Sequence, residues 1–248
     1  MYRIAKITFK PRITDKDDIF YSLDNILLLL FKNGQILDYI VEDHDTYFVA
    51  NVTTTDDDSL DEKYFNEYIK TELQKFSIDI QVCCNDALAT DSCHCHDNSH
   101  YIIAALPEFS SSPIICGDCG KEIPLIRIPY LFNQQEHYKI LDYQKACKNV
   151  DALFMYGLSD RFTKRQLMNP NSELNKIGLE IREELERKVN KPVYLFLDHF
   201  YGATDSIDCC PKCGKNLIKI NSGFIDLVCD CCKLGFKTYN KNNTSRNY

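Results

Sequence analysis

The hydrophobic pattern of the first third of the chain predicts alternating strands and helices. Over residues 2–9, Tyr2, Ile4, Lys6 and Thr8 alternate with Arg3, Ala5, Ile7 and Phe9, as expected for the two faces of a strand. Apolar residues then recur at helical spacing over 19–31, with Thr14 or Asp15 as the expected cap. The chain therefore begins with a strand followed by an amphipathic helix.

Two strands and a second helix are expected next. Residues 35–41 and 46–53 flank the turn-like sequence 43–45, which predicts a hairpin. The sequence Ser59-Leu60-Asp61-Glu62 matches a capping box, and the apolar spacing that follows predicts a helix over 60–76. A strand over 78–82 closes the series. The order β-α-β-β-α-β predicts a ferredoxin-like plait with both helices on one face of the sheet, within a domain over residues 1–106.

The remainder predicts a central domain over 107–200 and a small module over 201–248. Prolines at 124 and 129 favour an extended segment over 123–129. Helical spacing then recurs in three places, a strand follows, and the fold class is α+β overall. The predicted helices are 134–150, 160–168 and one capped by Ser172, and the predicted strand is 192–198.

The chain has enough hydrophobic residues to bury a core, and its charged residues are distributed unevenly along the sequence. Hydrophobic residues make up 44% and aromatic residues 12% of 248 residues, and the formal net charge is −7. Residues 1–82 contain 9 Lys and Arg against 16 Asp and Glu, whereas residues 209–248 contain 7 against 2. Because an acidic surface repels phosphate, nucleic-acid binding is expected only at the basic C-terminal module.

The clearest motif is a pair of C-x2-C sequences in the C-terminal module. Fifteen residues separate Cys213 from Cys229, so Cys210, Cys213, Cys229 and Cys232 match a zinc ribbon. Four thiolates complete a tetrahedral site and leave no position for water, which predicts a structural zinc ion and not a catalytic one.

A second zinc site is expected from the cysteines between residues 83 and 120. Cys116 and Cys119 form another C-x2-C knuckle, and Cys93 with Cys95 is the preferred completing pair. His94 or His96 remains open as a substitute for one of them, because neutral imidazole also ligates zinc. The pair Cys83 and Cys84 is interpreted as buried thiols at a strand end.

An ordered set of motifs resembles an uncharacterised bacterial family, described as zinc-ribbon-containing and as a candidate for nucleic-acid binding. The resemblance runs from about Cys116 to the ribbon, and it implies bound zinc and no particular activity. Its relatives that accompany secreted bacterial toxins would suit an immunity role. The chain departs from the family in having no tryptophan, and we expect Phe224 and Phe236 to fill that place in the ribbon core. The matching sequences are C-G-D-C at 116–119, I-P-L-I-R-I-P at 123–129, R-Q-L at 165–167, S-E-L at 172–174, P-V-Y-L at 192–195 and both C-x2-C sequences of the ribbon.

Catalysis is the least favoured class of function. The sequence lacks a phosphate-binding glycine loop, H-E-x-x-H and G-x-S-x-G. Asp198-His199 beside Tyr201 is the strongest remaining cluster, but adjacent side chains of an extended chain point to opposite sides. The run Asp56-Asp57-Asp58 is interpreted as solvent-facing carboxylates at a helix N-terminus. We therefore expect no enzyme.

Two binding functions remain. The acidic N-terminal domain favours a non-enzymatic, immunity-type protein that binds and neutralises a basic partner, such as a toxin or nuclease. The alternative is nucleic-acid binding by the ribbon, with Phe236 and Tyr239 for base stacking. Because the N-terminus lacks the apolar core of a signal peptide, we expect a cytoplasmic protein with reduced or metal-bound thiols and no membrane segment. The candidate nucleic-acid contacts are Lys212, Lys215, Lys219, Lys233 and Lys237.

Overall fold

The computed structural model describes residues 3–87, 91–109, 111–197 and 207–238. The chain divides into two compact units, Met1–Ser92 with Ile123–Tyr138, and Cys93–Glu122 with Lys139–Tyr248. The domain boundaries predicted after residues 106 and 200 do not coincide with this division. The difference arises because the segment 123–138 returns to the first unit, whereas the segment from Cys93 joins the second.

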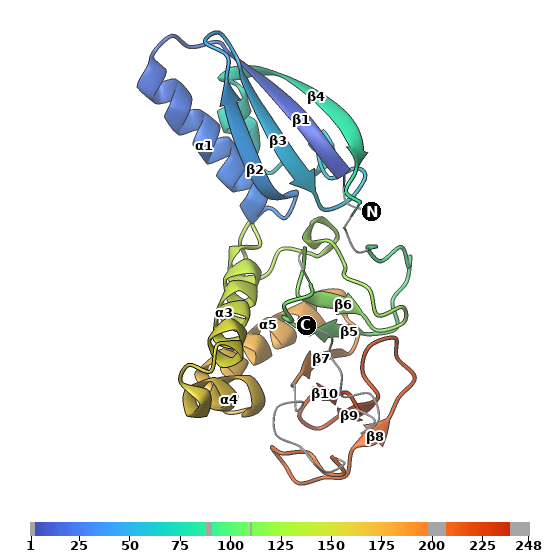
Figure 1. The fold of residues 1–248 in the computed structure, drawn as a ribbon. Helices are drawn as coiled ribbons and strands as arrows, with labels where there is room; N and C mark the ends of the chain where they lie inside the picture. Colours follow the sequence, from blue (N-terminus) through green and yellow to red (C-terminus); the bar gives the residue numbers. More distant parts are fainter. Residues whose placement is uncertain (1–2, 88–90, 110, 198–206, 239–248) are drawn as a thin grey trace. The chain divides into compact units, whose positions relative to one another are not determined.

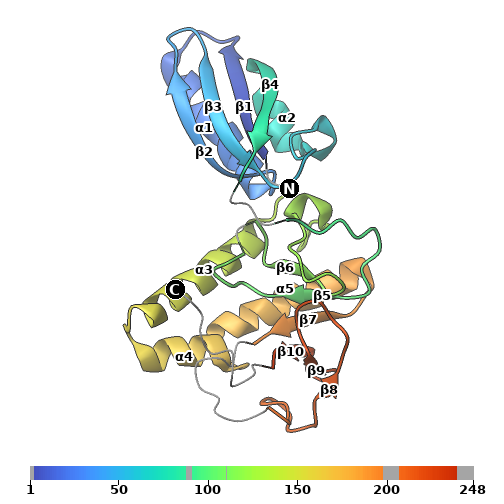
Figure 2. The ribbon, with the colours of Figure 1, turned by 45° about the vertical axis from the view of Figure 1, so that its right-hand side comes forward.

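The first unit is a four-stranded antiparallel sheet with the strand order β2-β3-β1-β4. Two helices lie on one face of this sheet (Figures 1 and 2). The element order is the β-α-β-β-α-β series that the sequence predicts. Its elements are β1 (Arg3–Pro11), α1 (Lys16–Lys32), β2 (Ile36–Asp43), β3 (Phe48–Thr54), η1 (Glu62–Tyr64), α2 (Glu67–Leu73), β4 (Phe76–Asn85) and the 3-10 turn η2 (Leu125–Arg127).

The core of the first unit lies between the sheet and its helices. Alternate residues of β1, namely Ala5, Ile7 and Phe9, point into it and are almost fully buried. Phe9 meets Phe76 edge to face at 5.7 Å between ring centroids. Each such buried aliphatic or aromatic side chain stabilises the fold by about 1.5–3 kcal/mol. This unit therefore has a hydrophobic core of its own, to which α1 adds Leu23, Ile26, Leu27 and Leu30.

The start of α1 confirms one of the two predicted caps. The Asp15 carboxylate accepts hydrogen bonds from the N–H groups of Asp17 and Asp18 at 3.0 and 3.1 Å. These bonds satisfy donors that have no partner within the helix. The helix ends at Lys32, and Gly34 then takes a positive φ of 74°.

The prediction that Ser59 caps a helix is wrong. Helix α2 begins only after Asn66, whose side chain accepts from the N–H of Ile69 at 3.0 Å. The Ser59 hydroxyl is instead buried in a turn, where it accepts from the N–H of Asp56 at 2.6 Å. A local hydrogen bond of this kind competes with helix capping and ends the strand in a turn.

The three aspartates lie in a turn and not at a helix N-terminus, and only Asp57 is solvent-exposed as predicted. Asp56 is buried and pairs with Arg127, which lies in η2 of the returning segment. Asp57 pairs with Arg3 at 2.9 Å, and Asp58 pairs with Lys63. The run therefore fixes the segment 123–138 and the start of β1 to this turn.

The second unit has one mixed sheet, with the strand order β6-β5-β7-β10-β9-β8. Strand β7 pairs in parallel with β5 on one side and with β10 on the other. The predicted ribbon is thus continuous with the central region in a single sheet. The elements are β5 (Tyr101–Ile103), β6 (Ile114–Cys116), α3 (Tyr138–Met155), α4 (Asp160–Met168), α5 (Glu173–Val189), β7 (Val193–Phe196), β8 (Ile218–Lys219), β9 (Leu227–Cys229) and β10 (Leu234–Phe236).

The helices of the second unit follow the sequence pattern closely, with one late start. α4 has the predicted limits, and the Ser172 hydroxyl accepts from the N–H of Asn175 at 3.2 Å to cap α5. α3 begins four residues after the predicted start at 134 and ends at Met155, five residues beyond the predicted end. Just before the helix, the N–H of His137 donates to the Lys32 carbonyl of α1 at 2.8 Å, a contact that competes with helical hydrogen bonding over 134–137. The predicted extended segment 123–129 likewise contains the 3-10 turn η2.

A search of the helices in the described residues finds none whose length and apolar character would let it cross a membrane.

The Asp56–Arg127 pair leads to a stability prediction. Replacing Asp56 with Ala leaves Arg127 without its buried partner and should lower the free energy of unfolding by about 2–3 kcal/mol. This loss is smaller than that of a fully buried ion pair because Arg127 is part-exposed. The matched control is Asp57→Ala, whose exposed pair with Arg3 should contribute much less because solvent and salt screen it. Urea unfolding followed by circular dichroism measures both. Equal losses in the two variants would contradict the assigned role of Asp56.

Candidate metal centres

The structure brings eight cysteines together as two groups of four. Within each group the sulfur atoms all lie within 4.8 Å of one another. Four thiolates bound to one zinc ion at about 2.3 Å stand roughly 3.8 Å apart, so the spacing fits a tetrahedral ion closely. These are the groupings that the motif spacing predicts. The first group is Cys93, Cys95, Cys116 and Cys119, and the second is Cys210, Cys213, Cys229 and Cys232.

The two C-x2-C-G-K sequences fold into the same knuckle. In both, the N–H of the first cysteine donates to the carbonyl five residues later, and the glycine N–H donates back to the carbonyl of that cysteine. The glycines have positive φ values of 72° and 70°, which glycine adopts without strain. The bonds are Cys116 to Lys121 (2.9 Å) and Gly120 to Cys116 (2.9 Å), and Cys210 to Lys215 (2.8 Å) and Gly214 to Cys210 (2.9 Å).

A third knuckle joins β9 to β10 and has a lysine in place of the glycine. Cys229 pairs with Leu234, five residues later, in the antiparallel register of the two strands. Lys233 has a φ of 54°, in the left-handed region where a side chain is strained. Its ammonium lies 5.5 Å from the Tyr194 ring centroid and 3.8 Å from the Asp230 carboxylate. These contacts offset part of the strain.

Backbone N–H groups favour the thiolate form of the second cysteine in both glycine knuckles. The N–H of Lys215 donates to Cys213 and is the main cause that lowers the pKa of that thiol to about 7. Burial acts against ionisation of Cys119, but the N–H of Lys121 and the neighbouring thiols outweigh it and lower the pKa. Thiolates are the form that binds zinc, so these bonds prepare the sulfur atoms for a metal.

Burial has the opposite effect on the inner cysteine of the first group. It raises the pKa of Cys116 to about 11. Without a cation, this sulfur stays protonated at neutral pH, whereas a coordinated dication deprotonates a thiol outright. The donor set of both groups therefore fits zinc, which takes four thiolate ligands in structural sites.

Asn98 is a supporting residue that the motif analysis missed. It is buried, and the Cys116 thiol donates to its Oδ1 at 3.3 Å. When the sulfur is a metal-bound thiolate, the carboxamide can turn its NH2 group to donate instead. Lys191 fixes this loop by donating to the Asn98 carbonyl at 2.7 Å and by pairing with Asp97. No sequence motif indicates this role, because the contacts join residues far apart in the chain.

The first knuckle and the ribbon touch through their backbones. The N–H of Gly223 donates to the Gly117 carbonyl at 2.7 Å, and the Ser222 hydroxyl donates to the same oxygen at 2.8 Å. A Cβ on Gly223 would stand 2.4 Å from the Gly120 nitrogen. Only glycine fits this approach, so the loop 222–223 joins the two metal groups within one unit.

Other candidate metal ligands lie outside the two groups. Cys83 and Cys84 are exposed, so their interpretation as buried thiols is wrong. They lie near the free end of β4, where a bulge interrupts the register with β1. Neither His94 nor His96 belongs to a cluster of metal ligands in the described part of the chain, and both are exposed.

The candidate nucleic-acid contacts are scattered. Lys212, Lys215 and Lys219 are exposed, whereas Lys233 and Lys237 lie over the rings of Tyr194 and Phe224. Phe236 is fully buried and cannot stack on a base. Phe224 is buried as well and belongs to a core cluster with Phe196 and Val228, as expected, whereas Phe236 is buried but is not part of that cluster. Tyr239, Tyr201 and the Asp198-His199 pair lie outside the described residues.

Metal content tests the two groups directly. In protein purified with zinc, Cys213→Ser and Cys116→Ser should each reduce the bound zinc from two ions to one, because a three-thiolate site binds zinc more weakly. Cys231→Ser is the matched control, since this cysteine is exposed beside Cys232 and outside the group. Mass spectrometric metal analysis after dialysis measures the ratio. Two ions retained in both site variants would contradict the assignment.

The backbone contact between Gly223 and Gly120 gives a second prediction. Gly223→Ala should destabilise the second unit by about 2 kcal/mol or more, because the new methyl group overlaps backbone atoms that cannot move aside. Gly157→Ala is the control: its Cβ would meet nothing within 4 Å, although its positive φ costs about 1 kcal/mol. Thermal unfolding monitored with zinc release measures both. A Gly223 variant as stable as the control would show that the contact is not close in solution.

Comparison with known proteins identifies part of the second unit together with the segment 123–138 of the first unit. A family model described as a domain of unknown function (DUF2310) matches residues 95–198. No curated protein and no solved structure matches the chain. The matched span contains Cys95, Cys116 and Cys119 but neither Cys93 nor the second sulfur group. Its description names no activity, metal or partner, so the chain is similar to a family whose function is unassigned.

Proposed function

We propose that this is a non-enzymatic, zinc-stabilised protein of the cytoplasm that binds a basic protein partner, in the manner of an immunity protein that neutralises a toxin or nuclease. The observation that carries the proposal is an exposed acidic and apolar surface along one edge of the first unit. This surface, here called the acidic edge, comprises Tyr21 and Asp24 of α1 and exposed residues of β2 that point alternately to the two faces of the sheet, namely Asp38, Ile40, Val41, Glu42 and Asp43.

The charge of the molecule is concentrated in the first unit. Its residues include 10 Lys and Arg against 19 Asp and Glu, whereas the second unit has 19 against 17. Most of the attraction for a basic partner therefore comes from the first unit. Opposite charge accelerates association and penalises wrong partners, which suits a protein that must capture one basic target.

The acidic edge also exposes large apolar side chains. Tyr21 is 72% and Ile40 is 73% exposed, and Val41 is 39% exposed. Exposed apolar residues within a polar rim are typical of protein–protein interfaces. The Tyr39 hydroxyl donates to Asp24 at 3.5 Å, which connects α1 to β2 beneath this surface. Glu42 accepts from Asn51 at 2.7 Å, a bond that lowers its pKa and keeps it charged.

The backbone of β2 supplies a second means of binding. β2 pairs with β3 on one side and, among the described residues, with no strand on the other. An unpaired edge can accept an extended segment of a partner as an additional strand. The carboxylates of β2 would then face basic side chains of that segment. An unpaired edge rich in acidic residues selects a basic strand.

Nucleic-acid binding by the ribbon is the weaker alternative. The exposed Lys212, Lys215 and Lys219 favour it, because they could contact a few phosphates. Against it, the ribbon aromatics Phe224 and Phe236 are buried, so the described part of the ribbon offers no aromatic platform for bases. We expect any such binding to be weak and to disappear at physiological salt.

The folds of the two units belong to this proposal as well. The strand order β2-β3-β1-β4 and the two helices on one face support a ferredoxin-like plait for the first unit. The two groups of four cysteines support zinc as the stabilising ion of the second.

A defined peptide tests the acidic edge. A ten-residue peptide of alternating Lys and Val should bind and shift the amide resonances of β2 in nuclear magnetic resonance spectra, and binding should weaken as salt rises. In the variant Ile40→Lys with Glu42→Lys, binding should fall at least about tenfold, because two exposed residues of β2 become basic.

The opposite edge of the same sheet provides the control. Asp79→Lys with Gln81→Lys makes the corresponding change on exposed residues of β4 and should leave the affinity unchanged to within about twofold. A Glu–Val peptide should not bind. Equal shifts on β2 and β4, or no binding of the basic peptide, would count against the proposal. Tight binding of labelled RNA or DNA at physiological salt, lost on Lys212→Ala with Lys215→Ala, would favour the alternative.

A further inference from the structure

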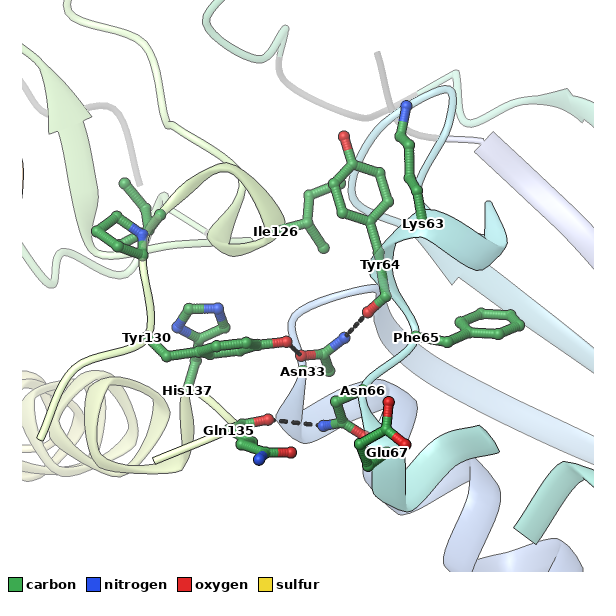
Figure 3. A pocket seen from close by; sticks show the side chains of 12 residues that line it. Asn33, Lys63, Tyr64, Phe65, Asn66, Glu67, Ile126, Tyr130, Gln135 and His137 are labelled. Atoms are coloured by element: carbon green, nitrogen blue, oxygen red, sulfur yellow. Dashed lines mark hydrogen bonds between the residues drawn. The ribbon is translucent and has the colours of Figure 1, made fainter. Parts of the chain in front are cut away.

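The first unit contains a pocket that the binding proposal does not use. Its volume is about 340 Å³, within the range of small-molecule sites. Three separate segments form its wall, namely the end of α1, the approach to α2 and the returning segment around 126–137 (Figure 3). All of them belong to the first unit.

Hydrogen bonds between side chains and backbone fix the wall of this pocket. The Tyr130 hydroxyl donates to Asn33 Oδ1 at 2.6 Å, and Asn33 Nδ2 donates to the Tyr64 carbonyl at 2.7 Å (Figure 3). Asn66 Nδ2 donates to the Gln135 carbonyl at 2.6 Å. Since these groups already have partners, they hold the shape of the pocket and are not waiting for a ligand.

His137 differs from its neighbours because its imidazole has a nitrogen without a partner. The residue is only 2% exposed and lines the pocket, with its ring 4.9 Å from the Tyr130 ring centroid. Its Nδ1 is buried and makes no hydrogen bond. Burial lowers the pKa of His137 to about 4, so the ring is neutral at neutral pH. A neutral imidazole nitrogen can form one hydrogen bond with a ligand.

The remaining lining defines the chemistry of a fitting ligand. Ile126, Ile128 and Pro129 present apolar surface, and the Tyr130 ring adds an aromatic face. The two charged lining residues do not offer a buried charge: Lys63 is half-exposed and pairs with Asp58, and Glu67 is exposed and pairs with Lys70. A charged ligand would lose water without gaining a buried counter-ion. A neutral, planar molecule with a ring N–H or ring nitrogen suits the site.

We propose that this pocket binds a neutral heteroaromatic molecule of nucleobase or nucleoside size, packed near Tyr130 and hydrogen-bonded to the imidazole of His137. The free nucleoside and a base within a nucleotide present the same ring to the pocket. The phosphate of a nucleotide would gain nothing there, because Lys63 already has carboxylate partners in Asp58 and Asp61.

Saturation-transfer nuclear magnetic resonance and calorimetry with adenosine, guanosine, cytidine and uridine test this site in the full-length, zinc-loaded protein. At least one nucleoside should bind, and its 5′-monophosphate should bind no more tightly. His137→Phe keeps an aromatic ring but removes the hydrogen bond, and should weaken binding about tenfold. His44→Phe is the matched control: this exposed histidine of the same unit also stacks on a tyrosine, Tyr47, at 4.7 Å.

A second variant keeps the test decisive if His137→Phe fails to fold. Gln135 lines the pocket with an exposed side chain, so Gln135→Trp should obstruct the pocket without disturbing the core. It should abolish nucleoside binding while circular dichroism stays unchanged. The proposal is overturned if no nucleoside binds at millimolar concentration, or if binding persists unchanged in the obstructed variant. Tighter binding of the monophosphates would overturn the requirement for a neutral ligand.

Discussion

The second unit depends on holding four sulfur atoms together at two places. Two unit charges about 4 Å apart repel by about 4 kcal/mol at the effective dielectric of a protein surface, so four bare thiolates cannot share such a volume. Either protons or a dication must offset the repulsion, and the backbone N–H groups that lower the pKa of Cys119 and Cys213 favour the dication. A dication held by these sulfur groups would therefore couple metal binding to the fold of this unit.

This constraint extends beyond the sulfur atoms because the knuckles are continuous with the sheet. β9 ends and β10 begins at the third knuckle, and β10 pairs with β7 in the middle of the sheet. The Tyr194 hydroxyl of β7 donates to Asp230 of that knuckle at 2.8 Å. The loop at Gly223 contacts the first knuckle. A change at either sulfur group is thus transmitted to the strands that organise the whole unit.

Local signals in the sequence predict local structure well here, and contacts between distant residues explain the failures. The C-x2-C spacing, the caps at Asp15 and Ser172 and the limits of α4 depend on neighbouring residues, and the structure contains each of them. The capping box failed because Ser59 is held by Asp56, which a partner at Arg127 buries. The return of 123–138 to the first unit, the role of Asn98 and the pocket at His137 depend on such distant contacts, so no periodicity could indicate them.

Bound zinc would explain the lysines beside the knuckles without any role for nucleic acid. Zinc with four thiolates carries a formal charge of −2, and each knuckle places a lysine within two residues of its last cysteine: Lys121, Lys215 and Lys233. These ammonium groups stabilise an anionic centre, and carboxylates in their place would oppose metal binding. The first unit has no described metal group and is free to carry the excess of acidic residues. The separation of charge along the chain therefore fits the proposal of a zinc-stabilised unit joined to an acidic unit that binds a basic partner.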